Sequence, residues 1–208
     1  MNDALHVRVD ATHVYWVSLG TYNGTTDSFA QDGKIERVRK DGTGRETLVS
    51  SLSAPYDLLL EGDNVIFSET GLASGPVKFG IRSVPKSGGS ITHLQDTHLA
   101  GDLVERSTEL VFYGQDATSE TIGLFRMPKS GGTVTLLVDD EDISGGPRIV
   151  ENQVYYAVDE DRILRVPVTG GSPVTVVVNE LWQSGDFEVD SCGLYFGTLD
   201  GQLMKAPR

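Results

Sequence analysis

The chain has 208 residues and a net charge of −13, because 30 acidic residues outnumber 17 basic ones. Such a chain gains no counterion release on a phosphate backbone, so we exclude nucleic acid as a partner, and anionic membrane surfaces are disfavoured for the same reason. The single cysteine, Cys192, excludes an intrachain disulfide and is not expected to be a nucleophile. No apolar run approaches the ~20 residues of a membrane-spanning helix, and the N-terminus lacks the basic and apolar regions of a signal peptide.

The first repeat, residues 5–50, contains the elements that the later ones share. The apolar and aromatic run Val14-Tyr15-Trp16 predicts one strand, and Ile35-Glu36-Arg37-Val38 predicts the next. A glycine turn, Asp41-Gly42-Thr43-Gly44, then leads to the β-rich run Glu46-Thr47-Leu48-Val49. Tight turns between alternating runs indicate antiparallel strands.

The same succession returns at intervals of about 40–50 residues, which is the spacing of propeller blades. A further strand is predicted before each aromatic run, so each repeat has four short strands, and we find no helical period. The later repeats cover residues 55–95, 100–139, 146–179 and 185–208. Three of the turns contain two adjacent glycines, which predicts tight hairpins; because the turn recurs without a following helix, we interpret it as structural and not as a phosphate cradle.

The sequence therefore predicts an all-β fold, a β-propeller of about five four-stranded blades forming one domain over residues 1–208. The last repeat has no candidate for its fourth, outer strand. Three explanations stay open: a three-stranded last blade, a piece of a longer propeller, or a second chain that covers the edge, which makes a homodimer through the incomplete blade possible. One arginine per repeat (Arg37, Arg82, Arg126 and Arg165) is expected to be structural.

The first repeat resembles the YWTD repeat of lipoprotein-receptor-like proteins. The resemblance rests on Val14-Tyr15-Trp16-Val17, on Asp41-Gly42-Thr43-Gly44 with the run that follows it, and on Ala54-Pro55-Tyr56-Asp57-Leu58. The later repeats change to a Val-Pro-Lys-Ser-Gly-Gly form that is similar to uncharacterised bacterial propellers. The resemblance implies a protein-binding scaffold and a secreted, periplasmic or cell-envelope location.

The loops between second and third strands are candidates for a functional face. They are long in the first three repeats, at residues 20–33, 70–80 and 115–123, and very short in the last two. Loops longer than the fold requires are a hint of function, although neutral insertion explains them equally well.

Acidic residues recur at the start of the first strand of a repeat. Asp57, Asp102 and Asp186 occupy equivalent positions, with His6 at that place in the first repeat. In a propeller these side chains would ring the mouth of the central channel on the long-loop face. Converging carboxylates there could bind a divalent cation, the one cofactor we consider; the alternative is that they are solvated or cap backbone amides.

Aromatic and histidine side chains in the same class of loops are further candidate ligand-binding residues. Trp182 has no equivalent in the other repeats, and a solitary exposed tryptophan suits ligand stacking or a partner contact. Tyr22, Phe79 and His98 are weaker candidates.

Three functions remain open from the sequence. The first is a non-catalytic binding scaffold that holds a protein, small-molecule or glycan ligand on the long-loop face. The second is a metal-dependent hydrolase or lyase, similar to propeller lactonases, with the carboxylate ring as its site. The third is a propeller fragment or engineered scaffold without activity. No serine-hydrolase, zinc-protease or cysteine-cluster motif is present, which favours the first over catalysis.

Overall fold

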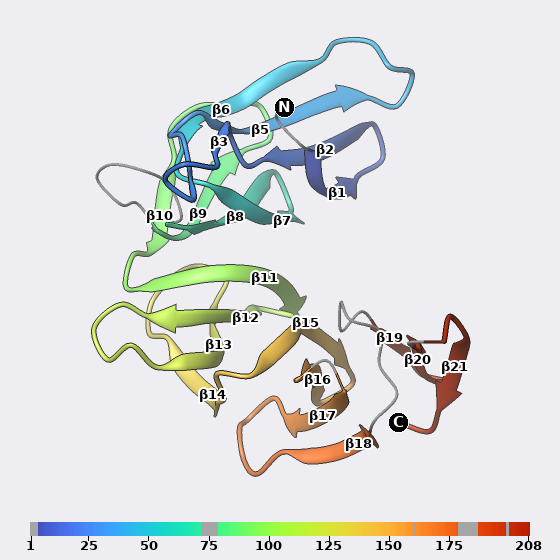
Figure 1. Cartoon of the computed structure of the whole chain (residues 1–208). Coiled ribbons are helices and arrows are strands. Elements are labelled where there is room, and N and C mark those ends of the chain that lie inside the picture. The colour runs from blue at the N-terminus through green and yellow to red at the C-terminus, as the bar shows by residue number, and fades with distance from the viewer. Residues whose placement is uncertain (1–3, 72–78, 160, 179–186, 199) are drawn as a thin grey trace. The chain divides into compact units, whose positions relative to one another are not determined.

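The computed structural model describes residues 4–71, 79–159, 161–178, 187–198 and 200–208, and none of them is helical. This part of the chain accordingly holds no helix that could span a membrane. Its strands form four sheets of four strands, one of three strands and a two-stranded hairpin (Figure 1). The all-β expectation is confirmed, and within the described residues the last repeat forms a sheet of three strands.

Each repeat folds into one antiparallel sheet, with its strands side by side in chain order except for the inserted hairpin β3–β4. The first sheet contains β1 (Ala4–Val9), β2 (His13–Ser18), β5 (Gly33–Arg39) and β6 (Glu46–Leu52). The second contains β7 (Pro55–Glu61), β8 (Asn64–Thr70), β9 (Phe79–Pro85) and β10 (Thr92–Gln95). The third contains β11 (His98–Arg106), β12 (Glu109–Asp116), β13 (Ile122–Pro128) and β14 (Thr135–Asp139). The fourth contains β15 (Ile143–Val150), β16 (Gln153–Val158), β17 (Arg162–Pro167) and β18 (Val174–Val178). The last contains β19 (Phe187–Asp190), β20 (Gly193–Gly197) and β21 (Leu203–Ala206), and the hairpin consists of β3 (Tyr22–Asn23) and β4 (Ser28–Phe29).

The chain divides into two compact units, each with its own core. One unit comprises Met1–Leu103, Gln115–Ser119 and Ser130–Gly132, and the other comprises Val104–Gly114, Glu120–Lys129 and Thr133–Arg208. In the first unit β7 packs against β1, β2 and β5. The cores are built from alternate residues of the central strands, as expected where one sheet packs on the next. Their buried members include Tyr15, Val17, Ile35, Leu58 and Phe67 in the first unit and Leu124, Ile143, Val154, Tyr156 and Val166 in the second.

The paired glycines after the third strands have the positive φ that their sequence predicts. In the third sheet, Gly131 and Gly132 have φ of 87° and 120°. A Cβ atom on Gly131 would lie 2.9 Å from the carbonyl oxygen of Leu94, so the turn packs closely on the preceding repeat and is structural. The connection is longer than the tight hairpin we expected, because β13 ends at Pro128 and β14 begins only at Thr135.

The arginines of the third strands do not all occupy the same face. Arg37 pairs with Tyr15 across β2–β5. Arg82 pairs with Phe67, which corresponds to Trp16 of the first repeat, so Arg82 lies one position earlier in its strand than Arg37 does. Since side chains alternate between the two faces of a strand, this shift of one residue places Arg82 on the opposite face from Arg37. Arg82 is buried there, with its Nε 2.7 Å from the carboxylate of buried Glu69. Arg82 therefore forms a buried ion pair at a position of the third strand that differs from that of Arg37.

Candidate functional site

Three of the sequence-predicted residues come together at the first strands of three successive sheets. His6 lies on β1, Asp57 on β7 and Asp102 on β11, and one ligand atom from each lies within 4.8 Å of the others. We call these three residues the inner cluster. Within the described residues, it is the only group of histidine, cysteine or acidic side chains close enough to hold an ion.

β-Bulges position two members of the inner cluster. The pairing of β1 with β2 shifts between Leu5 and Arg8, where His6 lies, and His6 has a φ of 45°. The pairing of β7 with β8 shifts between Pro55 and Leu58, where Asp57 lies. A bulge turns a side chain away from the regular alternation and is common next to functional sites. The same irregularity in two repeats explains why equivalent sequence positions meet in space.

Asp57 is the buried centre of the inner cluster. Its Oδ1 accepts hydrogen bonds from the Leu58 N–H at 2.7 Å and from Arg8 Nη2 at 3.1 Å, and its Oδ2 accepts one from the Leu103 N–H at 2.9 Å. The Nδ1 of His6 lies 3.2 Å from Oδ1. Asp57 therefore joins β1, β7 and β11 through residues that all belong to the first unit, and it caps two backbone amides, which was one of the two expected alternatives.

Ser68 extends this network beneath Asp57. Its Oγ accepts the Asp57 N–H at 3.0 Å and donates to the carbonyl oxygen of Gly101 at 2.8 Å. The two residues on either side of Asp102 thus contribute backbone groups to the network, Gly101 through its C=O and Leu103 through its N–H. Asp102 is held on a fixed stretch of β11.

His6 and Asp102 are half-buried, whereas Asp57 is buried. The hydrogen bond to Asp57 raises the pKa of His6 above its ordinary value, burial opposes this, and the charges of Asp57 and Asp102 add to it. The imidazole also lies 4.9 Å from the ring of Tyr56, centre to centre. The site therefore presents a carboxylate beside an imidazole that gains a proton more readily than a histidine in water.

The pKa of His6 predicts a pH dependence of stability. A histidine whose pKa is raised on folding stabilises the folded state fully below its unfolded pKa of about 6.5, and this contribution is lost as the pH rises through the higher folded value. We expect the difference in free energy of unfolding between the wild type and His6→Gln to be largest near pH 5.5 and to fall towards pH 8. Urea unfolding across this range checks it.

A matched variant separates the effect of half-buried His6 from that of His98, which is buried. Burial lowers the pKa of His98, although Asp116 opposes the shift, so its contribution to stability falls as the pH decreases. The wild-type difference from His98→Gln should therefore have the opposite pH trend. A His6→Gln difference that does not vary with pH would contradict the assignment.

The inner cluster does not fit a resident divalent cation. Asp57 already receives two backbone N–H groups and the Arg8 guanidinium, and a cation 3.1 Å from its carboxylate opposes a second positive charge. This leaves His6 and Asp102 as the ligands in the described part of the cluster, fewer than the three or four that zinc requires or the six to eight that calcium requires.

The remaining candidate residues lie elsewhere or outside the described residues. Asp186 and Trp182 lie outside the described residues. Tyr22 is exposed on the β3–β4 hairpin, where its hydroxyl donates to Asp27 at 2.6 Å and its ring packs on Phe29. Phe79, half-buried, begins β9, and its carbonyl oxygen accepts a hydrogen bond from Arg82.

His98 is buried at the start of β11. Its Nδ1 lies 2.8 Å from the Thr97 hydroxyl, and its Nε2 lies 3.3 Å from the carboxylate of Asp116. Both ring nitrogens thus contact neighbours within the first unit, which suits a packing residue better than a ligand.

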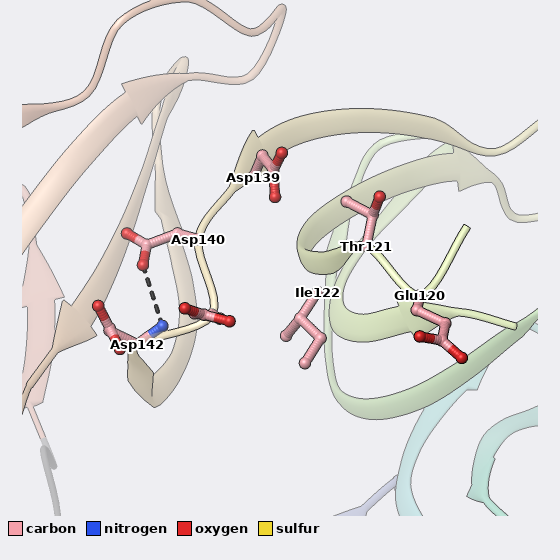
Figure 2. Close-up of a pocket in the computed structure, with 7 residues that line it drawn as sticks. Glu120, Thr121, Ile122, Asp139, Asp140 and Asp142 are labelled. Carbon is pink, nitrogen blue, oxygen red and sulfur yellow. Dashed lines mark hydrogen bonds between the residues drawn. The ribbon is translucent and has the colours of Figure 1, made fainter.

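The second unit has an acidic hollow that the sequence reasoning did not single out. It measures about 390 Å³, and Figure 2 shows it between the start of β13 and the β14–β15 loop. Its lining consists of Glu120, Thr121, Ile122, Asp139, Asp140, Glu141 and Asp142. The acidic run at residues 139–142 was the available signal. These carboxylates do not converge into an ion-binding group, and the N–H of Asp142 donates to Asp140 at 3.1 Å, so the loop partly caps itself.

A buried tyrosine near this loop yields a further prediction. The hydroxyl of Tyr156 is buried without a hydrogen-bond partner in the described residues, and burial together with the charge of Asp140 raises its pKa. An unpaired buried hydroxyl costs about 1–3 kcal/mol. Tyr156→Phe is expected to leave stability unchanged or raise it by about 1 kcal/mol, measured by urea unfolding. A loss above about 1 kcal/mol would show that the hydroxyl is bonded.

No family model matches the sequence. No curated protein matches it either. Among solved structures, the chain is similar to one in a nidogen–laminin complex, with a TM-score of 0.69 and 14% identity over 99% of this chain and 76% of that one. It is similar to a putative TolB from Agrobacterium tumefaciens, with a TM-score of 0.66 and 14% identity over 98% of this chain and 80% of that one.

A gluconolactonase from Xanthomonas campestris is similar as well, with a TM-score of 0.63 and 14% identity over 98% of this chain and 71% of that one. At such identity the likeness concerns the fold alone, and it includes a complex as well as an enzyme. Together with the five repeated antiparallel sheets, it shows that this chain has a β-propeller fold.

Proposed function

We propose that the protein is a non-catalytic binding propeller whose ligand site is the inner cluster. The observation that carries this proposal is the division of roles among its residues. Asp57 is buried and fixes the strands, whereas His6 and Asp102 are half-buried on rigid elements beside it. A site built on strands and held by a second layer of hydrogen bonds is suited to specific binding.

The chemistry of the site favours a ligand that donates hydrogen bonds to the Asp102 carboxylate. The Asp102 carboxylate accepts strong, charge-assisted hydrogen bonds from hydroxyl or ammonium groups, and the His6 imidazole accepts a hydrogen bond when neutral and donates one when protonated. The net charge of −13 disfavours anionic ligands. Neutral and amino glycans, or a protein side chain with such groups, have the required chemistry.

A glycan array with neutral, amino and acidic members tests the proposal. Binding is expected for neutral or amino glycans, and Asp102→Asn or His6→Gln should reduce it at least tenfold. Glu120→Gln, in the acidic hollow, is the matched control and should leave binding unchanged. Binding to acidic glycans alone, or binding that neither variant weakens, would contradict the proposal.

The metal-dependent hydrolase or lyase is the second candidate, favoured by ligand atoms within 4.8 Å of one another. Thermal unfolding with EDTA and then with Ca²⁺, Mg²⁺, Mn²⁺ or Zn²⁺ distinguishes the two. An ion at ~100 times its dissociation constant raises the unfolding temperature by roughly 5–10 °C. We expect no such shift; a shift that Asp102→Asn abolishes would overturn the non-catalytic proposal.

The resemblance of the first repeat to YWTD propellers supports a partner outside the cytoplasm. We therefore include a secreted, periplasmic or cell-envelope location in the proposal. Fractionation of the producing cells with a compartment marker is the corresponding measurement.

A further inference from the structure

The last sheet exposes a position that is buried in every other repeat. Leu203, the first residue of β21, pairs with Gly197 of β20, and its side chain is 80% exposed. At the equivalent position of the third strand, the other four sheets carry an apolar residue that is 0% exposed. These residues are Ile35, Ile81, Leu124 and Ile163.

The other sheets show what covers this position. Each has a fourth strand beyond the third one, and in three of them a valine lies opposite the equivalent residue: Val49, Val138 and Val177. In the described residues, β21 has no strand on its outer side. Its backbone N–H and C=O groups on that side are therefore available for strand pairing.

An apolar hollow of about 430 Å³ adjoins this edge. Phe187 of β19 and Phe196 of β20 line it together with Leu203, and the Arg148 guanidinium lies over the Phe187 ring. Beyond Leu203 on β21, the ammonium of Lys205 lies 5.3 Å from the centre of the Tyr195 ring. The edge thus offers a backbone to pair with, an apolar surface, the Arg148–Glu188 ion pair and the ammonium of Lys205.

We propose that this edge binds an extended segment of a partner protein as the fourth strand of the sheet. The chain's own outer strands define the chemistry of the occupant. It runs antiparallel to β21, carries a β-branched apolar residue opposite Leu203, and carries an acidic or hydroxyl residue opposite Lys205. The first sheet shows this pattern, since Val49 faces Ile35 and Glu46 faces Arg37. Main-chain pairing supplies affinity, and the alternate side chains supply specificity.

A synthetic peptide with the sequence of β6, Glu46–Leu52, is the probe, carrying a fluorescent label. We expect saturable binding in fluorescence anisotropy, a rise of about 5–10 °C in unfolding temperature at ~100 times Kd, and slower hydrogen exchange in the amides of β21. The same peptide with Val49→Pro loses a backbone donor and should not bind.

Two variants make the test specific. Leu203→Asp should weaken peptide binding at least tenfold without changing the unfolding temperature, because the side chain is already 80% exposed. Leu136→Asp, at another exposed leucine on β14, should leave binding unchanged.

Two outcomes would overturn the proposal. One is no binding up to about 1 mM peptide, or binding that Leu203→Asp does not weaken. The other is a dimer in analytical ultracentrifugation that Leu203→Asp converts to monomer, which would assign the edge to a second copy of this chain.

Discussion

Arg82→Met is expected to lower the free energy of unfolding by about 3–5 kcal/mol, because it leaves the carboxylate of Glu69 buried without its cation. Arg82 is 4% and Glu69 1% exposed, and they lie on adjacent strands, β9 and β8. Urea unfolding followed by circular dichroism measures the loss.

A double-mutant cycle tests the cause. Glu69→Gln retains an oxygen for the Ser53 N–H, which the carboxylate accepts at 2.8 Å. In Arg82→Met with Glu69→Gln no buried charge remains, so the combined loss should be smaller than the sum of the two single losses by about 1–3 kcal/mol. Arg126→Met is the matched control. Its pair with Glu109 is partly exposed at 3.4 Å, and its loss should be below about 1 kcal/mol.

Equal losses for Arg82→Met and Arg126→Met would show that the buried pair is not stabilised by its charges. Strict additivity in the cycle would have the same meaning. Either result would mean that the position of Arg82 on the buried face, beside Glu69, adds nothing to the free energy of unfolding.

Asp57→Asn is expected to lower the free energy of unfolding by about 2–4 kcal/mol, since it weakens several charge-assisted hydrogen bonds at once. An asparagine has one acceptor oxygen, whereas the N–H groups of Leu58 and Leu103 approach different oxygens of Asp57. The amide nitrogen would therefore face a donor on one side. Arg8 would also lose its anion.

Hydrogen exchange locates this effect. The amide hydrogen of Leu103 should exchange much faster in Asp57→Asn. In that variant the Leu103 N–H faces either the amide nitrogen of the new side chain, which is no acceptor, or an uncharged oxygen, which is a weaker one. Asp102→Asn is the control, because Asp102 is half-buried and the N–H groups of Leu58 and Leu103 donate to Asp57. This variant should lower the free energy of unfolding by less than about 1 kcal/mol. A larger loss for Asp102→Asn than for Asp57→Asn would reverse the roles given to the two carboxylates.

The sequence by itself determined the repeat, its strands and the order of the strands within each sheet. These features depend on local periodicity and turn residues, such as the aromatic run at Val14-Tyr15-Trp16 and the glycines at 131 and 132. It also identified His6, Asp57 and Asp102 as equivalent positions, because structural repeats transfer position from one sheet to the next.

Only the tertiary structure decided which of these residues do what. The bulges in β1 and β7 bring His6 towards Asp57, and the Leu103 N–H makes Asp57 a structural residue. Arg82 lies one position away from the place of Arg37 in the third strand, so its side chain is on the other face of the sheet, buried beside Glu69. Leu203 is exposed because no strand of the described residues lies on the outer side of β21, and not because of its own residue type. Burial, pairing and charge come from neighbours distant in sequence, and a local pattern contains no information about them.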